Sequence, residues 1–484
     1  MALFKTHQGG SMAPNLINKA LEFFSKAGSI IGQRYYVVSE DIHQDTKTTW
    51  AEIFISDPEK AFKLLFWSRD PRGGAGHRQL LRELLHEVAI ESAAARSWIR
   101  ANLEGIVEYG RYDDLKALYD TPLETAVLEF FSANISHPLC AKWMDRRDRK
   151  LRDYMKLTSK EYRKLVVGNS NIVERLMSEK RWDEIDYVTL PNLAMIRSAA
   201  AFLRHDSERF LAHIRDHGLV GTVAFPHEMM RLHKAGTPVE IVQSFFDHLP
   251  DYIKEGERIL PMVDVSGSMC AEASGSISCM DVSVSLGLYC SDRLPGQFNK
   301  KMMTFASEPE IIDWSRTNNV VEAITQAVTA DWGMSTDISK ALDCILKNAE
   351  LWNVPQSNMP TMLLVLSDMQ FSQAVRSHTR TFEKGPHKTI LQTEESVIDA
   401  ALQRWEDSGY KRPAIVYWNL QNYAGQPSYT SNNVAFISGF SPAIMEAVLS
   451  CIERDETGEV TKLDAEVVME TAISKYQVAD PFAR

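Results

Sequence analysis

The residues best suited to chemistry lie in the segment RILPMVDVSGSMC, from Arg258 to Cys270. Its apolar run predicts a buried strand that ends close to Asp264, and Ser266 and Ser268 follow in a loop of small residues. One carboxylate and two hydroxyls would then lie on the same side of a turn. Such oxygen ligands suit a hard divalent cation, usually Mg²⁺, and open α/β sheets bind ligands at the carboxyl ends of their strands.

Two later segments supply further oxygen ligands. A Ser-Thr-Asp turn places Thr336 before an amphipathic helix, and a second buried strand ends in Ser367-Asp368. The set resembles the metal-ion-dependent adhesion site (MIDAS) of von Willebrand factor A (vWA) domains, with the residues Asp264, Ser266, Ser268, Thr336 and Asp368. The resemblance implies that the three hydroxyls coordinate Mg²⁺, or another divalent cation such as Mn²⁺ or Ca²⁺, while both carboxylates act mainly through water. The cation would then take a carboxylate from an acidic loop of a partner protein. The alternative is a vWA fold that keeps these residues and binds no metal.

Two kinds of structure must position these side chains. Up to about Pro250 the chain shows short helical patterns, one of them over Ala94–Tyr109, without a clean repeat period. From Glu257 apolar strands alternate with helices, which predicts a doubly wound, mainly parallel sheet. We therefore expect the fold class α + α/β. An N-terminal α-helical repeat (HEAT-like) module would span residues 14–255, a Rossmann-like vWA domain residues 256–475, and a short tail would follow.

Composition limits the classes of partner and compartment. The 484-residue chain has 53 basic and 64 acidic residues, and a net charge of −11 argues against general coating of nucleic acid. Its six cysteines form no CxxC pair and no zinc spacing, which is typical of reduced thiols. Neither a signal peptide nor a transmembrane run is apparent, so we expect a cytoplasmic protein without membrane contact.

Two basic segments are candidates for RNA binding. Lys142 to Lys164 has ten basic and four acidic residues, with Trp143, Tyr154 and Tyr162 between them for stacking on unpaired bases. The Gly-rich turn before the helix at His77 could hold a phosphate. The candidate residues are Arg69, Arg72, Arg78, Lys142, Arg146, Arg147, Arg149, Lys150, Arg152, Lys156, Arg163 and Lys164, and Lys160 lies among them. A solvated helical surface or a protein-binding patch could explain the first segment, and a structural turn with buried Arg–Asp pairs could explain the second.

The order of the two halves resembles the Ro/TROVE ribonucleoproteins. A more specific resemblance is to a related, poorly characterised family of vWA proteins of plants, fungi and viruses. It rests on KLLFWSRDPRGGAGHRQLLRELL (Lys63–Leu85), YGRYDDL (Tyr109–Leu115), the segment Glu161–Ala194, DVSGSM, LVLSDMQF, PAIVYWNL (Pro413–Leu420) and VAFISGFSP (Val434–Pro442). The resemblance implies a scaffold whose TROVE-like helices bind structured small RNA and whose Mg²⁺ site docks a protein. The alternative is a protein-only adaptor that uses the metal site without RNA. No nucleophile–base pair or cofactor motif is apparent, and HE-x-x-H fails at Arg231, so we do not expect an enzyme.

Overall fold

The computed structural model describes most of the chain in two compact units. The described residues are 19–27, 40–170, 173–190, 192–218, 225–253, 257–270, 272–274, 277–294, 296–305, 308–329, 338–367, 394–420, 434–438, 448–451, 453–454, 456, 460–462 and 464–483. The first unit, the helical unit, holds those of 19–27, 40–217 and 472–483. The second, the sheet unit, holds those between 218 and 471.

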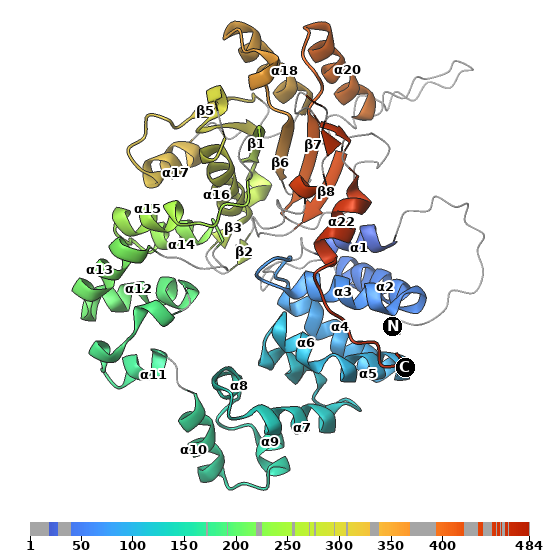
Figure 1. The fold of residues 1–484 in the computed structure, drawn as a ribbon, viewed down its shortest axis with the longest axis vertical. Helices are drawn as coiled ribbons and strands as arrows, with labels where there is room; N and C mark the ends of the chain where they lie inside the picture. The colour runs from blue at the N-terminus through green and yellow to red at the C-terminus, as the bar shows by residue number, and fades with distance from the viewer. Residues whose placement is uncertain are drawn as a thin grey trace. The chain divides into compact units, whose positions relative to one another are not determined.

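The helical unit consists of short helices joined by tight turns (Figure 1). In order these are α1 (Lys19–Ala27), α2 (Glu40–Ser56), α3 (Pro58–Arg69), α4 (Arg78–Glu91), α5 (Ala93–Ala101), α6 (Leu103–Glu108), η1 (Tyr112–Leu118), α7 (Glu124–Asn134), α8 (Pro138–Trp143), α9 (Arg149–Tyr154), α10 (Ser159–Asn169), α11 (Val173–Ser178), η2 (Trp182–Glu184), η3 (Tyr187–Thr189), α12 (Asn192–His205) and α13 (Ser207–His217). The predicted helical character of this half is confirmed.

Capping residues and aromatic side chains explain these helices. Asp57 caps α3 by accepting a hydrogen bond from the backbone N–H of Lys60, with Pro58 in the first turn. Thr158 and Glu161 form a reciprocal capping box at the start of α10. Trp50 is buried and donates its indole N–H to the carbonyl of Ala61 at 2.8 Å, which joins α2 to α3.

The C-terminal segment packs on the helical unit instead of forming the expected short tail. Asn102 interrupts the single helix predicted over Ala94–Tyr109, because its side chain bonds both the N–H and the carbonyl of Ala479 at 2.8 Å. The phenol of Tyr476 is buried and donates to Asp70 at 3.0 Å. The helical unit is therefore completed by residues far away in the sequence.

The sheet unit contains a six-stranded sheet with the strand order β5-β4-β1-β6-β7-β8. Its strands are β1 (Ile259–Asp264), β4 (Lys301–Phe305), β5 (Ile311–Asp313), β6 (Met362–Ser367), β7 (Ala414–Asn419) and β8 (Val434–Ser438). All neighbours are parallel except β4 and β5, which are antiparallel. Two small pairs, β2 (Glu272–Ser274) with β3 (Ile277–Ser278) and β9 (Glu453–Arg454) with β10 (Val460–Lys462), were not predicted.

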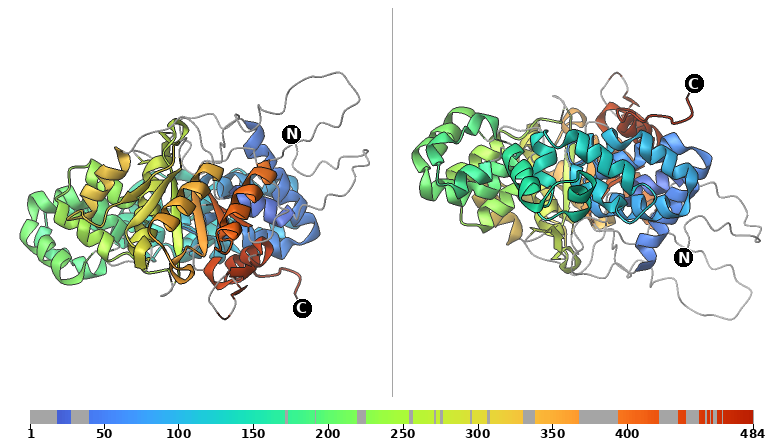
Figure 2. Two further views of the ribbon diagram at one scale, coloured as in Figure 1. Left: turned by 90° about the horizontal axis from the view of Figure 1, so that it is seen from above. Right: turned by 90° about the horizontal axis from the view of Figure 1, so that it is seen from below.

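Helices cover both faces of this sheet, so the predicted doubly wound fold is confirmed (Figure 2). They are α16 (Cys279–Asp292), α17 (Val320–Val328), α18 (Ile338–Leu351) and α20 (Glu394–Asp407), with α22 (Ala465–Ile473) near the end of the chain and the 3₁₀ turns η4 (Gly267–Cys270), η5 (Gly296–Phe298) and η6 (Gln356–Asn358). The almost wholly buried α16 packs tightly on β1, because a Cβ at Gly287 would lie 2.4 Å from Val263 Cγ2. Within the described residues, no helix is long and apolar enough to cross a membrane.

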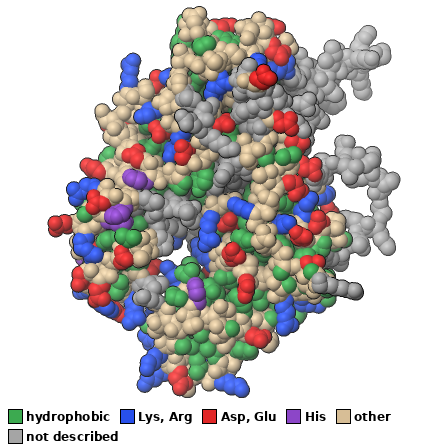
Figure 3. Space-filling view, viewed as in Figure 1, with side chains coloured by type: hydrophobic (Ala, Val, Ile, Leu, Met, Phe, Trp, Pro, Cys, Tyr) green, Lys and Arg blue, Asp and Glu red, His purple; other side chains and the backbone are tan. Residues whose placement is uncertain are grey.

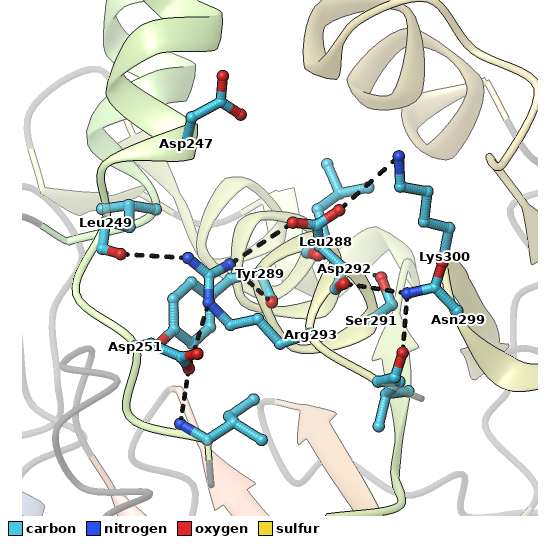
Figure 4. A network of polar contacts seen from close by, with 12 residues as sticks. Asp247, Leu249, Asp251, Leu288, Tyr289, Ser291, Asp292, Arg293, Asn299 and Lys300 are labelled. Carbon is cyan, nitrogen blue, oxygen red and sulfur yellow. Dashed lines mark hydrogen bonds and ion pairs between the residues drawn. The ribbon is translucent and has the colours of Figure 1, made fainter. Parts of the chain in front are cut away.

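The compact units differ from the predicted boundary near residue 255, because α14 (Glu228–Lys234) and α15 (Val239–Asp247) belong to the sheet unit. Arg293, just after α16, explains much of this attachment (Figure 4). Its guanidinium donates to the carbonyls of Leu249 and Tyr289 at 3.2 Å and pairs with Asp251 at 3.5 Å. It also lies 4.0 Å from the ring centroid of Tyr289 and 5.9 Å from that of Phe246 in α15.

Candidate functional site

Asp264 and Ser367 form the centre of the candidate metal site. Asp264 is the last residue of β1, Ser367 the last of β6, and both are completely buried. The hydroxyl of Ser367 donates to Asp264 Oδ2 at 2.5 Å, and the backbone N–H of Ser266 donates to Oδ1 at 2.9 Å. These two contacts hold the carboxylate at the carboxyl edge of the sheet.

The strand order makes this edge a ligand site in principle. From β1 the chain proceeds to β4 on one side, and it later returns to β6 on the other side of β1. Adjacent strands whose connections run in opposite directions leave a crevice at their carboxyl ends, and open α/β sheets bind ligands there. Asp264 and Ser367 come from the two strands that flank this crevice.

Ser266 is buried in the loop after β1, and the carbonyl of Ser266 accepts the N–H of Met269 at 3.0 Å in the turn η4. The side chain of Ser268, and Thr336 and Asp368 as a whole, lie outside the described residues. Two of the five predicted ligands, Asp264 and Ser266, are thus seen together. Ser367 was not among the predicted site residues, although its place at the end of the strand beside β1 could have indicated it.

The donor set fits a hard cation in its chemistry, since the residues described at this edge offer carboxylate and hydroxyl oxygens. No group of three His, Cys, Asp or Glu side chains suited to a metal occurs among the described residues. The predicted site differs from such a group, because three of its five ligands are hydroxyls. Binding of Mg²⁺, Mn²⁺ or Ca²⁺ stays a prediction.

The N-terminus of α16 adds a second polar cluster to the sheet unit. Ser278 and Asp281 form a capping box there, and Asp281 also pairs with Lys234 of α14 at 2.5 Å. His227, just before α14, is buried, and burial lowers its pKa to about 3. A neutral His227 beside the buried Glu228 indicates a structural role at the start of α14.

In the helical unit, acidic residues already pair with some of the predicted RNA-binding residues. Lys142 pairs with Glu174, Lys150 with Asp120 and Glu124, and Arg152 with Asp153, at distances of 2.5–3.2 Å. Seven basic residues of α9, α10 and the adjoining turns are exposed and have no acidic partner in the described part of the chain. They are Arg146, Arg147, Arg149, Lys156, Lys160, Arg163 and Lys164. Lys and Arg side chains project from the lower edge of the molecular surface in this region (Figure 3).

The aromatic residues of this segment differ in their access to solvent. Tyr162 is buried, so the expectation that it stacks on bases is wrong. Tyr154 is 39% exposed. Trp143 is half-buried, and the guanidinium of Arg111 lies 4.6 Å from its ring centroid.

The Gly-rich turn after α3 has clear structural roles. Asp70 accepts the N–H groups of Arg72 and Gly73 as well as the phenol of Tyr476. Gly74 allows close packing, since a Cβ there would lie 2.0 Å from the carbonyl oxygen of Trp67. Arg69 is buried and pairs with Asp114 at 2.8 Å, whereas Arg72 is exposed and Arg78 is half-buried. Arg69 therefore fits the structural interpretation of this turn.

Comparison with known protein families finds two domains of unknown function. The family DUF7788 matches residues 259–483, and DUF2828 matches residues 117–245. An uncharacterized protein of Acanthamoeba polyphaga mimivirus is 24% identical over 364 residues. That alignment covers 66% of this chain and 59% of the relative, so the chain spans less than two thirds of the relative's length.

A solved structure also matches across most of the chain. The Ro protein of Deinococcus radiodurans aligns over 94% of this chain and 99% of its own, with 14% identity and a TM-score of 0.37. A TM-score of this size does not establish a shared fold. The two-part architecture therefore rests on the helices and strands described above, and membership of the vWA family stays a prediction.

Proposed function

We propose that this protein is an RNA-binding scaffold whose sheet unit docks a protein partner through a divalent cation. The observation that carries the RNA part is the exposed basic surface of α9, α10 and the adjoining turns, defined by Arg146, Arg147, Arg149, Lys156, Lys160, Arg163 and Lys164. These cations have no acidic partner in the described chain, although acidic residues exceed basic ones overall. Phosphates are suitable counter-ions for such a surface.

Phosphate binding by this surface predicts a strong dependence on salt. Each neutralised phosphate of a single strand contributes about −0.7 to the slope of log K against log salt concentration. If about five of the basic residues contact phosphates, the slope would be roughly −3.5. Exposed Tyr154 adds an aromatic surface for stacking on an unpaired base.

A charge-neutralising triple variant tests this function. Changing Arg146, Arg147 and Arg163 to Gln should weaken binding of a structured small RNA in fluorescence anisotropy and reduce the salt slope by about 2. The matched control changes Arg100, Arg197 and Arg204 to Gln, since these are also exposed arginines of the helical unit. Equal affinity and salt slope in both triple variants would refute the proposed surface.

The docking part rests on the contact between Asp264 and Ser367 in the crevice between β1 and β6. A cation held mainly by hydroxyls keeps much of its positive charge and would accept an Asp or Glu carboxylate from a partner. In this proposal the residues Asp264, Ser266, Ser268, Thr336 and Asp368 form the site. Their role is to orient the cation and leave one position open, which is binding and not catalysis.

Thermal unfolding with and without MgCl₂ or MnCl₂ tests the cation site without knowledge of the partner. A ligand that binds only the folded state raises stability by about 2.7 kcal/mol at a hundred times its Kd. Asp264→Asn should abolish this rise, whereas Asp407→Asn, which alters an exposed carboxylate of α20, should retain it. No metal-dependent shift in the unaltered protein would refute this part. A shift without RNA binding would favour the protein-only adaptor.

A further inference from the structure

Four arginines and two aspartates form a cluster in the helical unit where α3, α4 and η1 meet. We call it the arginine cluster, and it consists of Arg69, Arg78, Arg82, Arg111, Asp113 and Asp114. With all six groups ionised, four positive charges less two negative ones leave a net charge of +2. The metal site described above belongs to the other unit, the sheet unit.

Two of the arginines take up both carboxylates. The Nε of Arg69 donates to Asp114 Oδ2 at 2.8 Å, and the Nε of Arg82 donates to Asp114 Oδ1 at 2.6 Å. A second nitrogen of Arg82 donates to Asp113 at 2.6 Å. Gly110 permits this arrangement, because a Cβ there would lie 2.7 Å from Asp114 Oδ2. Arg69 and Arg82 are therefore structural members of the cluster.

The other two arginines, Arg78 and Arg111, form no direct ion pair in the ranges that the structure describes, and attraction by Asp113 and Asp114 offsets only part of what lowers their pKa. Burial, and then repulsion by Arg82, lowers the pKa of Arg78. Burial, and then repulsion by Arg69, lowers the pKa of Arg111, and Arg78 contributes to the same effect. Half-buried cations that repel each other carry a free-energy cost, which a bound anion would remove.

The surroundings of these two arginines indicate the kind of anion. Arg78 is the first residue of α4, where the helix dipole favours negative charge, and the side chain of His77 already accepts the N–H of Leu80 at 2.9 Å. Arg111 lies against Trp143, and the ammonium of Lys142 lies 5.9 Å from the same ring centroid. Trp143 thus joins the arginine cluster to the basic segment that begins at Lys142.

We infer that Arg78 and Arg111 bind the terminal phosphate of an RNA strand, whose chain continues along the exposed basic surface of α9 and α10. The inference rests on the proposed RNA binding and names the group that is recognised. A phosphate monoester carries nearly two negative charges at neutral pH, which match the +2 of the cluster. An internal phosphodiester carries one and would leave half of the excess charge uncompensated. Guanidinium groups also match the geometry of phosphate oxygens.

Binding of three forms of one short single-stranded RNA tests this inference, with a 5′-phosphate, a 3′-phosphate or hydroxyls at both ends. The full-length protein should bind one of the phosphorylated forms roughly tenfold to a hundredfold more tightly than the hydroxyl form. The preferred end identifies the strand polarity. Arg78→Gln and Arg111→Gln should each lose most of this preference, and Arg100→Gln, an exposed arginine of α5 (Ala93–Ala101), should retain it.

Inorganic phosphate provides a second measurement on the unaltered protein. At constant ionic strength it should displace the phosphorylated RNA more readily than chloride does. Equal affinity for all three RNAs would overturn the terminal-phosphate site and leave the proposed RNA binding intact. Absence of binding to every form would contradict both.

Discussion

Replacement of Gly74 by alanine separates a structural role of the Gly-rich turn from a role in phosphate contact. The new Cβ would lie 2.0 Å from the carbonyl oxygen of Trp67 and 3.0 Å from the hydroxyl of Tyr476, and Cβ contacts shorter than 3.0 Å are essentially never observed. The oxygen belongs to the backbone of α3 and cannot rotate away. It also accepts the N–H of Ala75 at 2.9 Å, so a shift of the turn would weaken that bond.

The expected cost follows from these contacts. Overpacking of a tight site costs about 1–3 kcal/mol, and a lost backbone hydrogen bond adds about 0.5–1.5 kcal/mol. Gly74→Ala should therefore destabilise the protein by about 2–4 kcal/mol. For a unit of this size that corresponds to a fall in Tm of roughly 5–15 °C.

Two other glycines of the same unit provide controls. A Cβ at Gly73 would lie 1.9 Å from the Nζ of Lys475, the far end of a flexible side chain, and at an ordinary 3.8 Å from Asp70 Oδ2, so Gly73→Ala should cost less than about 1 kcal/mol. A Cβ at Gly168 in α10 would have no atom within 4 Å, and alanine there should stabilise the helix by about 0.5–1 kcal/mol. Urea unfolding followed by circular dichroism, together with RNA anisotropy, gives both readouts. Normal stability of Gly74→Ala with weakened RNA binding would refute the structural argument and favour phosphate contact at the turn.

Three further predictions concern buried polar groups. Tyr476→Phe removes a hydrogen bond to Asp70 and should cost about 1.5–3 kcal/mol in urea unfolding; an unchanged midpoint would show that the C-terminal segment adds little. Arg69→Met leaves the buried Asp114 paired with Arg82 alone, which should lower the free energy of unfolding by about 3 kcal/mol. The RNA affinity of the folded protein should not change. Reduced affinity at normal stability would instead place Arg69 in the binding site. Folding lowers the pKa of His227 to about 3, whereas an unfolded histidine titrates near 6.5. Between these values the unfolded state binds one more proton than the folded state. The free energy of unfolding should therefore fall by up to about 1.4 kcal/mol per pH unit as the pH drops from about 6.5 toward 3. His227→Gln should remove that contribution between pH 6.5 and 5, and an identical pH dependence in both proteins would contradict the burial of a neutral histidine.

The sheet was the most predictable part of the fold. Long apolar runs such as those of β1 and β6 can be buried on both sides only in a parallel sheet, and both strands are wholly buried. Their ends then place Asp264 at the carboxyl edge without further information. The hydrogen bond from Ser367 depends on strand register, since Val263 pairs with Leu366, and that register becomes known only when the strand order is known.

The return of the C-terminal segment was not predictable from local patterns. Tyr476 meets Asp70 across 406 positions of sequence, and neither residue carries a signal for the other. The same C-terminal segment accounts for the error at Asn102, whose amide bonds Ala479 and ends a helix that the apolar spacing alone would have continued. Periodicity identifies the buried side of a helix, but it does not reveal which distant segment covers that side.

The arginines of the arginine cluster illustrate why charge alone does not identify a binding site. Arg69 and Arg78 belong to one short sequence motif and carry the same charge. Arg69 is buried and pairs with Asp114, so its loss should reduce the stability of the fold. Arg78 forms no direct ion pair in the described chain, so its loss should weaken the binding of an anion. Arg111 lies in the YGRYDDL motif but was not among the predicted RNA-binding residues. It shares the situation of Arg78, because the carboxylates of Asp113 and Asp114 already pair with Arg69 and Arg82. The pairing of each guanidinium, and not the local count of basic residues, is therefore the property that should distinguish variants defective in RNA binding from variants defective in folding.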